Sequence, residues 1–172
     1  MSGWVQGNAL DEDAVEAFAH ALHDCGGRTA ALDLDLGGNR MDAAGVAWLA
    51  LTPLVGALRL FNTGLGDAGV RCLVQHLTQG HLGQVEYLDL CGVGMGAAAA
   101  AELSAALAAG GAPALLVLEV GANPATQEDD WEEAVQQLRE ARPALDVVWR
   151  TSDPGEGRDQ VPGNSPAIQA EE

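Results

Sequence analysis

The segment at residues 89–97, DLCGVGMGA, contains the residue types that a nucleotide-binding turn requires. Gly92, Gly94 and Ala97 fit the pattern G-x-G-x-x-A between an expected strand and an expected helix. In such a turn the small residues let the backbone approach a pyrophosphate, and a later acidic residue accepts a hydrogen bond from the ribose. Glu119 is the candidate for that acceptor. This chemistry is that of a nucleotide-binding enzyme, which we keep as the alternative function.

Histidine and cysteine side chains are the other candidates for metal or nucleophilic chemistry. His20 and His23 lie three residues apart on an expected helix, but two ligands do not make a metal site. The three cysteines, Cys25, Cys72 and Cys91, form no C-x-x-C motif, and spacing alone places no His or Asp partner beside them. We therefore predict no catalytic residue, no cofactor and no metal site.

Composition limits the kinds of partner that the chain can bind. The 172 residues include 25 acidic residues, eight arginines and no lysine, which gives a net charge of −17. Such a chain cannot neutralise phosphates, so nucleic acid and anionic membrane surfaces are excluded as partners. The acidic run at residues 128–133 opens an expected helix, where negative charge is favourable. A content of 48% apolar residues is enough for a hydrophobic core.

The elements that would position these residues recur along the chain. Three segments read L-x-L-x-x-(N/T/V)-x-(L/M), and each has another leucine ten residues after the middle position: 34–49, 58–73 and 88–103. The middle position is Asn39, Thr63 or Val93. Partial copies cover 5–18 and 118–126, and a last expected strand covers 145–150. Equivalent strand positions lie 24 to 31 residues apart, and the shortest step is explained by Thr52-Pro53, which ends a helix early.

The physical role of each part of this unit can be predicted. The two leucines of L-x-L point to the same side of a strand, because side chains alternate along it. An Asn at the turn can hydrogen-bond backbone groups where the strand ends. Val70, Leu73 and Leu77 follow a helical spacing and should face the strand. One unit cannot bury its leucines alone, so successive units must stack.

This pattern resembles the leucine-rich repeat family, in the long, helix-containing subclass typified by ribonuclease inhibitor. The residues that carry the resemblance are Leu34, Leu36, Asn39, Leu58, Leu60, Leu65, Leu88, Leu90 and Met95. The resemblance implies an α/β solenoid of about five repeats, with a parallel sheet on the concave face and helices on the convex face. We assign residues 1–150 to this domain. Residues 151–172 are rich in Pro, Gly and charge, which indicates a disordered acidic tail.

Strand residues between the inward leucines should point out of the concave face. Its predicted partner-binding residues are Trp4, Asp33, Asp35, Arg59, Phe61, Tyr87, Asp89, Glu119 and Asp146. Exposed aromatic residues among charged ones are typical of a protein-binding patch, although a solvated sheet face would have the same pattern. We predict a protein–protein interaction module whose partner has a basic or mixed-charge surface. A structural subunit of a larger assembly, or a fragment of a longer repeat protein, is a further interpretation.

The sequence also predicts how the ends of the repeat stack behave and in which cellular compartment the protein lies. No polar cap is recognisable at either end, and the chain closes on the strand Val147-Val148-Trp149. Open strand edges invite pairing, so we expect self-association through uncapped ends. The unpaired cysteines, the absence of a signal-peptide pattern and the absence of a long apolar run predict a cytoplasmic protein in a reducing compartment.

Overall fold

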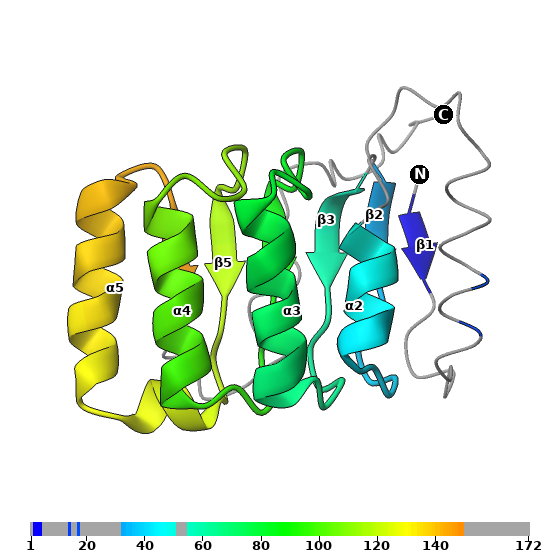
Figure 1. Cartoon of the computed structure of the whole chain (residues 1–172), viewed down its shortest axis with the longest axis horizontal. Helices are drawn as coiled ribbons and strands as arrows, with labels where there is room; N and C mark the ends of the chain where they lie inside the picture. Colours follow the sequence, from blue (N-terminus) through cyan, green and yellow to red (C-terminus); the bar gives the residue numbers. More distant parts are fainter. Residues whose placement is uncertain (1, 5–13, 15–16, 18–31, 51–54, 150–172) are drawn as a thin grey trace, which may run out of the picture.

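The computed structural model describes residues 2–4, 14, 17, 32–50 and 55–149, and these residues form a parallel β-sheet with helices (Figure 1). Its six strands lie side by side in chain order, and each pairs with the next in parallel. The strands are β1 (Ser2–Trp4), β2 (Leu32–Asp35), β3 (Val55–Arg59), β4 (Tyr87–Asp89), β5 (Val117–Glu119) and β6 (Asp146–Val148). The α/β class predicted from the sequence is confirmed.

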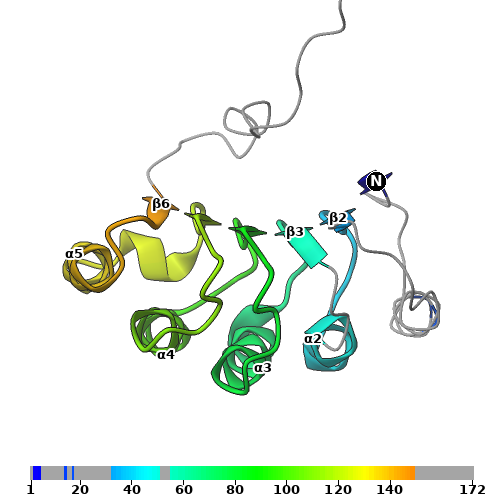
Figure 2. The same ribbon diagram turned by 90° about the horizontal axis from the view of Figure 1, so that it is seen from above.

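The described helices that connect these strands lie on one side of the sheet, and the sheet bends gently with the helices on its outer side (Figure 2). They are α2 (Ala43–Ala50), α3 (Gly66–Thr78), α4 (Ala97–Ala108) and α5 (Asp130–Ala141), with a short 3₁₀ helix, η1 (Pro124–Gln127), before α5. The helix α2 has eight residues against 13 in α3, which agrees with its predicted early end. None of the described helices has the length and apolar character needed to cross a membrane.

The register of the sheet aligns the side chains in columns across the strands. One column contains Trp4, Asp35, Arg59, Asp89, Glu119 and Val148, and the column two residues earlier contains Ser2, Asp33, Ala57, Tyr87, Val117 and Asp146. Eight of the nine predicted partner-binding residues lie in these two columns, on the face that the L-x-L spacing predicted, and Phe61 lies in the turn after β3. The register continues into the turns, where the N–H of Asn62 donates to the carbonyl of Cys91 at 2.9 Å.

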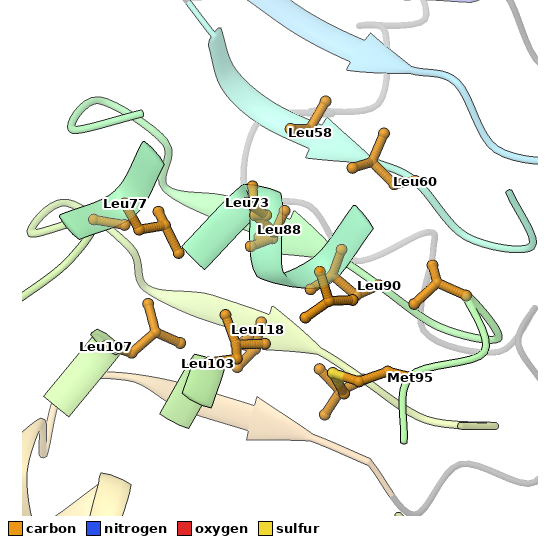
Figure 3. Close-up of a cluster of buried hydrophobic side chains, with 14 of the residues drawn as sticks. Leu58, Leu60, Leu73, Leu77, Leu88, Leu90, Met95, Leu103, Leu107 and Leu118 are labelled. Atoms are coloured by element: carbon orange, nitrogen blue, oxygen red, sulfur yellow. The ribbon is translucent and has the colours of Figure 1, made fainter. Parts of the chain in front are cut away.

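The core lies between the sheet and the helices (Figure 3). Leu60 and Leu90 are 0% exposed, as the alternation of the strands predicted. The helical positions Val70, Leu73 and Leu77 are also buried, and Figure 3 shows Leu73 and Leu77 on the side of α3 that faces the sheet. Burial of each such side chain stabilises the fold by about 1.5–3 kcal/mol, so these leucines are the main favourable contribution from side chains.

Polar side chains satisfy the backbone where each strand ends. Asn39 donates from its amide to the carbonyl of Leu36 at 2.9 Å, and the Thr63 hydroxyl donates to the carbonyl of Leu60 at 2.6 Å. Threonine therefore fills the place of asparagine in that turn. Val93 cannot do so, because it has no polar group.

Asn123, at the equivalent position after β5, compensates for Val93. Its amide donates to the carbonyls of Leu90 and Val120, both at 2.8 Å, and to that of Gly121 at 3.3 Å. Its carbonyl oxygen accepts from the N–H groups of Gly94 and Met95, each at 3.0 Å. One side chain thus satisfies two neighbouring turns.

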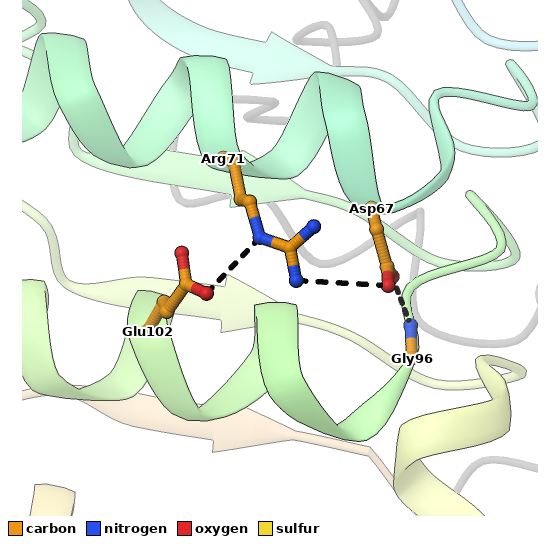
Figure 4. A network of polar contacts seen from close by, with 4 residues as sticks. All are labelled: Asp67, Arg71, Gly96 and Glu102. Atoms are coloured by element: carbon orange, nitrogen blue, oxygen red, sulfur yellow. Dashed lines mark hydrogen bonds and ion pairs between the residues drawn. The ribbon is translucent and has the colours of Figure 1, made fainter.

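Helices α3 and α4 are joined by a polar network at their surface (Figure 4). The Asp67 carboxylate accepts from the N–H of Gly96 at 2.7 Å, immediately before α4. Arg71 lies between Asp67, at 3.9 Å, and Glu102, at 3.0 Å. The three charged side chains are almost half exposed, so their ion pairs contribute little to stability, whereas the Asp67 contact satisfies an N–H at a helix start.

The C-terminal end of the sheet is covered more fully than the sequence suggested. Trp131 of α5 is 4% exposed, and its ring meets that of Trp149 edge to face, with centroids 6.4 Å apart. Val147 is buried as well, and Trp149 packs against the core. The expectation of a bare last strand is therefore wrong for its side chains, because α5 folds back over them. Among the described strands, β6 still has only one neighbour.

Candidate binding surface on the open face of the sheet

The sheet face opposite the helices, which we call the open face, carries the candidate functional residues. The inward leucines Leu88 and Leu90 fix its composition, because the residues that alternate with them point the other way. At its centre lie Arg59 of β3, Tyr87 and Asp89 of β4, Cys91 of the following turn, and Glu119 of β5. These five residues are called the central cluster.

Arg59 and Tyr87 contact each other across neighbouring strands. The guanidinium carbon of Arg59 lies 4.8 Å from the centre of the Tyr87 ring, which is a cation–π arrangement. Burial raises the pKa of the Tyr87 hydroxyl well above its ordinary value, and the negative charges of Glu119 and Asp89 raise it further. The hydroxyl therefore stays protonated at neutral pH, and its oxygen is buried although the residue as a whole is partly exposed.

Two aspartates of the predicted site are buried, contrary to the expectation that they are exposed. Asp89 is 0% exposed and Asp35 is 7% exposed. Each carboxylate turns back onto its own chain: Asp89 accepts from the N–H of Cys91 at 2.9 Å, and Asp35 from that of Gly37 at 3.0 Å. They consequently stabilise the turns after β4 and β2 and offer little surface to a partner.

Phe61 is likewise buried, at 4% exposed, although it was predicted to be an exposed anchor. Its ring lies over Gly37 of the neighbouring turn, where a Cβ atom would overlap the ring. The missing side chain at Gly37 therefore makes room for Phe61. The sequence-based prediction treated Phe61 as an outward-pointing aromatic residue and did not foresee that its ring would lie over the neighbouring glycine.

The accessible part of the predicted site is smaller and more polar than expected. Arg59, Tyr87, Glu119 and Asp33 are partly exposed, and Asp146 is exposed. Trp4 belongs to β1 and to the predicted column, but its side chain lies outside the described residues, as do His20, His23, Cys25 and the tail 151–172. Three acids and one arginine are thus the charged, accessible members of the predicted site among the described residues.

Cys91 is a member of the central cluster that the sequence analysis rejected as a metal or nucleophilic candidate. Its sulfur and one carboxylate oxygen each of Asp89 and Glu119 lie within 4.8 Å of one another. Burial raises the pKa of the Cys91 thiol, and the charge of Asp89 and a hydrogen bond to it raise it further. A search for partners by spacing along the chain could not find this group. The column register could, because Asp89 and Glu119 are paired residues and Cys91 is two positions further on.

The candidate nucleotide-binding turn uses its backbone donors within the fold. Gly92 and Gly94 have positive φ angles of 62° and 82°, as a tight turn requires. The N–H groups of Gly94 and Met95 donate to Asn123, and that of Gly96 donates to Asp67. These are the groups that would bind a pyrophosphate, so the geometry gives no support to the nucleotide-binding alternative.

No protein-family model matches this chain, and no curated protein matches it.

Proposed function

We propose that residues 1–150 form a leucine-rich repeat solenoid of about five repeats, of the ribonuclease-inhibitor-like subclass. The proposal is supported by the period of 24 to 31 residues, together with strands that pair in chain order and helices on one face. It is also supported by the hydrogen bonds that Asn39, Thr63 and Asn123 make at equivalent turns.

The proposed function is binding of a partner protein through the open face, without catalysis by this chain. The observation that carries it is the accessible set Asp33, Arg59, Tyr87, Glu119 and Asp146, on a sheet face that no described helix covers. Tyrosine and arginine are common interface anchors. Because acids outnumber arginine on this surface, the partner should present a basic or mixed-charge surface.

The test uses charge reversal at accessible positions. After a partner has been captured from the native source and identified by mass spectrometry, the double variant Asp33→Arg/Asp146→Arg should abolish its binding. The matched control is Glu133→Arg/Glu140→Arg, which makes the same charge change on the exposed surface of α5 and should bind normally. Equal binding by both variants would contradict the assignment of the open face.

Salt dependence provides a second readout of the same proposal. Wild-type binding should weaken as ionic strength rises, because the negative chain attracts a basic partner over long range. Surface plasmon resonance at several salt concentrations would measure this as a falling association rate. An association rate that does not change with salt would argue for an apolar docking surface instead.

The nucleotide-binding alternative makes the opposite prediction. Calorimetry should detect no saturable binding of NAD(P) or FAD, since Asn123 and Asp67 already accept from the N–H groups at 94–96. Micromolar binding that disappears in Gly94→Asp would overturn the proposal that this chain only binds protein.

A further inference from the structure

Three metal-ligating side chains of different chemistry meet at the centre of the open face. Asp89 ends β4, Cys91 follows it by two residues, and Glu119 is paired with Asp89 on β5. The alternation of the strand directs Asp89 and Cys91 to the same face, and the parallel register brings Glu119 beside them. The arrangement therefore follows from the fold and does not depend on a long loop.

We propose that Asp89, Cys91 and Glu119 form a binding site for a thiophilic divalent cation of the Zn²⁺ class. Their candidate ligand atoms lie within 4.8 Å of one another. Zn²⁺ binds sulfur at about 2.3 Å and carboxylate oxygen at roughly 2.0–2.2 Å, so two ligand atoms of one tetrahedral ion lie roughly 3.4–3.7 Å apart. Binding would draw the three ligand atoms closer together through rotation of their side chains.

The charges around these atoms favour a cation. Two carboxylates and a thiol share a partly dehydrated surface, where like charges repel more strongly than in water. Arg59 is the positively charged member of the central cluster, and its guanidinium lies over the Tyr87 ring. A divalent cation would offset the two carboxylates and would favour the thiolate form of Cys91.

The mixed set of ligands also determines which cation is expected. Mg²⁺ and Ca²⁺ take oxygen ligands, whereas a thiolate selects Zn²⁺ and similar ions. Three protein ligands are one fewer than a closed tetrahedral zinc site has. The fourth ligand would be water or a donor group from a bound partner.

The experiment uses the full-length protein, reduced and freed of metal with a chelator that is then removed. Titration with Co²⁺ should produce a thiolate-to-cobalt charge-transfer band, and Zn²⁺ should remove that band by displacing Co²⁺, whereas excess Mg²⁺ should not. Cys91→Ser should eliminate the band. Cys72→Ser removes another thiol, at a position on α3 away from the cluster, and should leave the band unchanged.

A second variant keeps the proposal testable if Cys91→Ser fails to fold. Glu119→Gln retains the size of the side chain and removes its charge, and circular dichroism would check its fold. Loss of a direct ligand should lower Zn²⁺ affinity at least as much as the roughly 10–100-fold caused by losing a residue that only orients a ligand. Unchanged Zn²⁺ affinity in Glu119→Gln, absence of the band in the wild type, or its persistence in Cys91→Ser would each overturn the site. None of these measurements requires a partner protein, so their outcome is independent of the proposed function.

Discussion

Asp89 and Leu90 are neighbours in the chain, and both are 0% exposed, but for different physical reasons. Leu90 lies among apolar side chains between the sheet and the helices, where its contribution comes from removal of apolar area from water. Asp89 lies on the opposite face and accepts a hydrogen bond from the N–H of Cys91. Its contribution therefore comes from satisfying a backbone donor, and truncation of the two residues should have different costs.

Alanine substitutions separate the two contributions. Leu90→Ala should lower the free energy of unfolding by about 2–5 kcal/mol, because it leaves a cavity. Asp89→Ala should lower it by about 1–3 kcal/mol, because it leaves a buried N–H without its acceptor. Asp146→Ala, at an exposed strand position, is the control and should stay within about 0.5 kcal/mol. Urea unfolding measures all three, and a neutral Asp89→Ala would show that its hydrogen bond contributes nothing in solution.

Asn123 is a second residue whose side chain should contribute strongly to the free energy of unfolding. It makes five hydrogen bonds to two turns, whereas Thr63 makes one to its own strand end. Asn123→Ala should therefore destabilise the protein by at least about 3 kcal/mol, and Thr63→Val by about 1 kcal/mol. Chemical denaturation of both variants gives the comparison. Equal losses would mean that water replaces Asn123 in the turn after β4.

At the scale of elements, the sequence predicts what depends on local periodicity. Alternation in L-x-L predicted which side chains of each strand face the helices, and the common spacing predicted the register that pairs Asp89 with Glu119. Helical spacing predicted the buried positions of α3. The exposure of open-face residues was predicted less well, because the burial of Phe61 depends on Gly37 in the neighbouring turn, which contributes no side chain. Contacts between strands decide such positions, and single-strand patterns contain no information about them.

A pair of histidines, His76 near the end of α3 and His81 in the turn after it, should make the stability of the fold depend on pH. The Nδ1 atoms of His76 and His81 lie 2.9 Å apart, so one must accept the hydrogen bond that the other donates. Burial lowers the pKa of His76, and the charge of His81 lowers it further. In the unfolded chain His76 has an ordinary pKa of about 6.5, so the unfolded state binds more protons below that pH. Stability is therefore complete above about pH 6.5 and should fall as the pH drops below it.

Unfolding at several pH values would test this contribution. Between about pH 7.5 and 5.5 the wild type should lose more stability than His76→Gln, which cannot titrate there. The carboxylates titrate similarly in both proteins, so the difference between the two slopes reports the histidine pair. Identical slopes would contradict a lowered pKa of His76 in the folded state.

At the scale of the whole molecule, each strand and helix buries one side against the next, so the last layer needs another cover. At the C-terminal end Trp131 and Trp149 provide it, in an edge-to-face contact beside Val135 and Val147. Aromatic residues suit this position, because they cover a large area with few rotatable bonds. Self-association through the ends stays a prediction. At the C-terminal end the contact between Trp131 and Trp149 would limit it, because this contact covers apolar side chains.

Trp149→Ala should uncover the apolar side of α5 and β6. Because Trp149 is only partly buried, the substitution should cost less than the roughly 3–5 kcal/mol of a fully buried tryptophan. The newly exposed surface should promote association between copies, since apolar area then lies beside the edge of β6 that pairs with no other described strand. Sedimentation velocity over a roughly hundredfold concentration range would reveal a shift to larger species in the variant relative to the wild type. A variant that unfolds at a lower denaturant concentration but sediments like the wild type would show that Trp149 stabilises the last layer without protecting it from association.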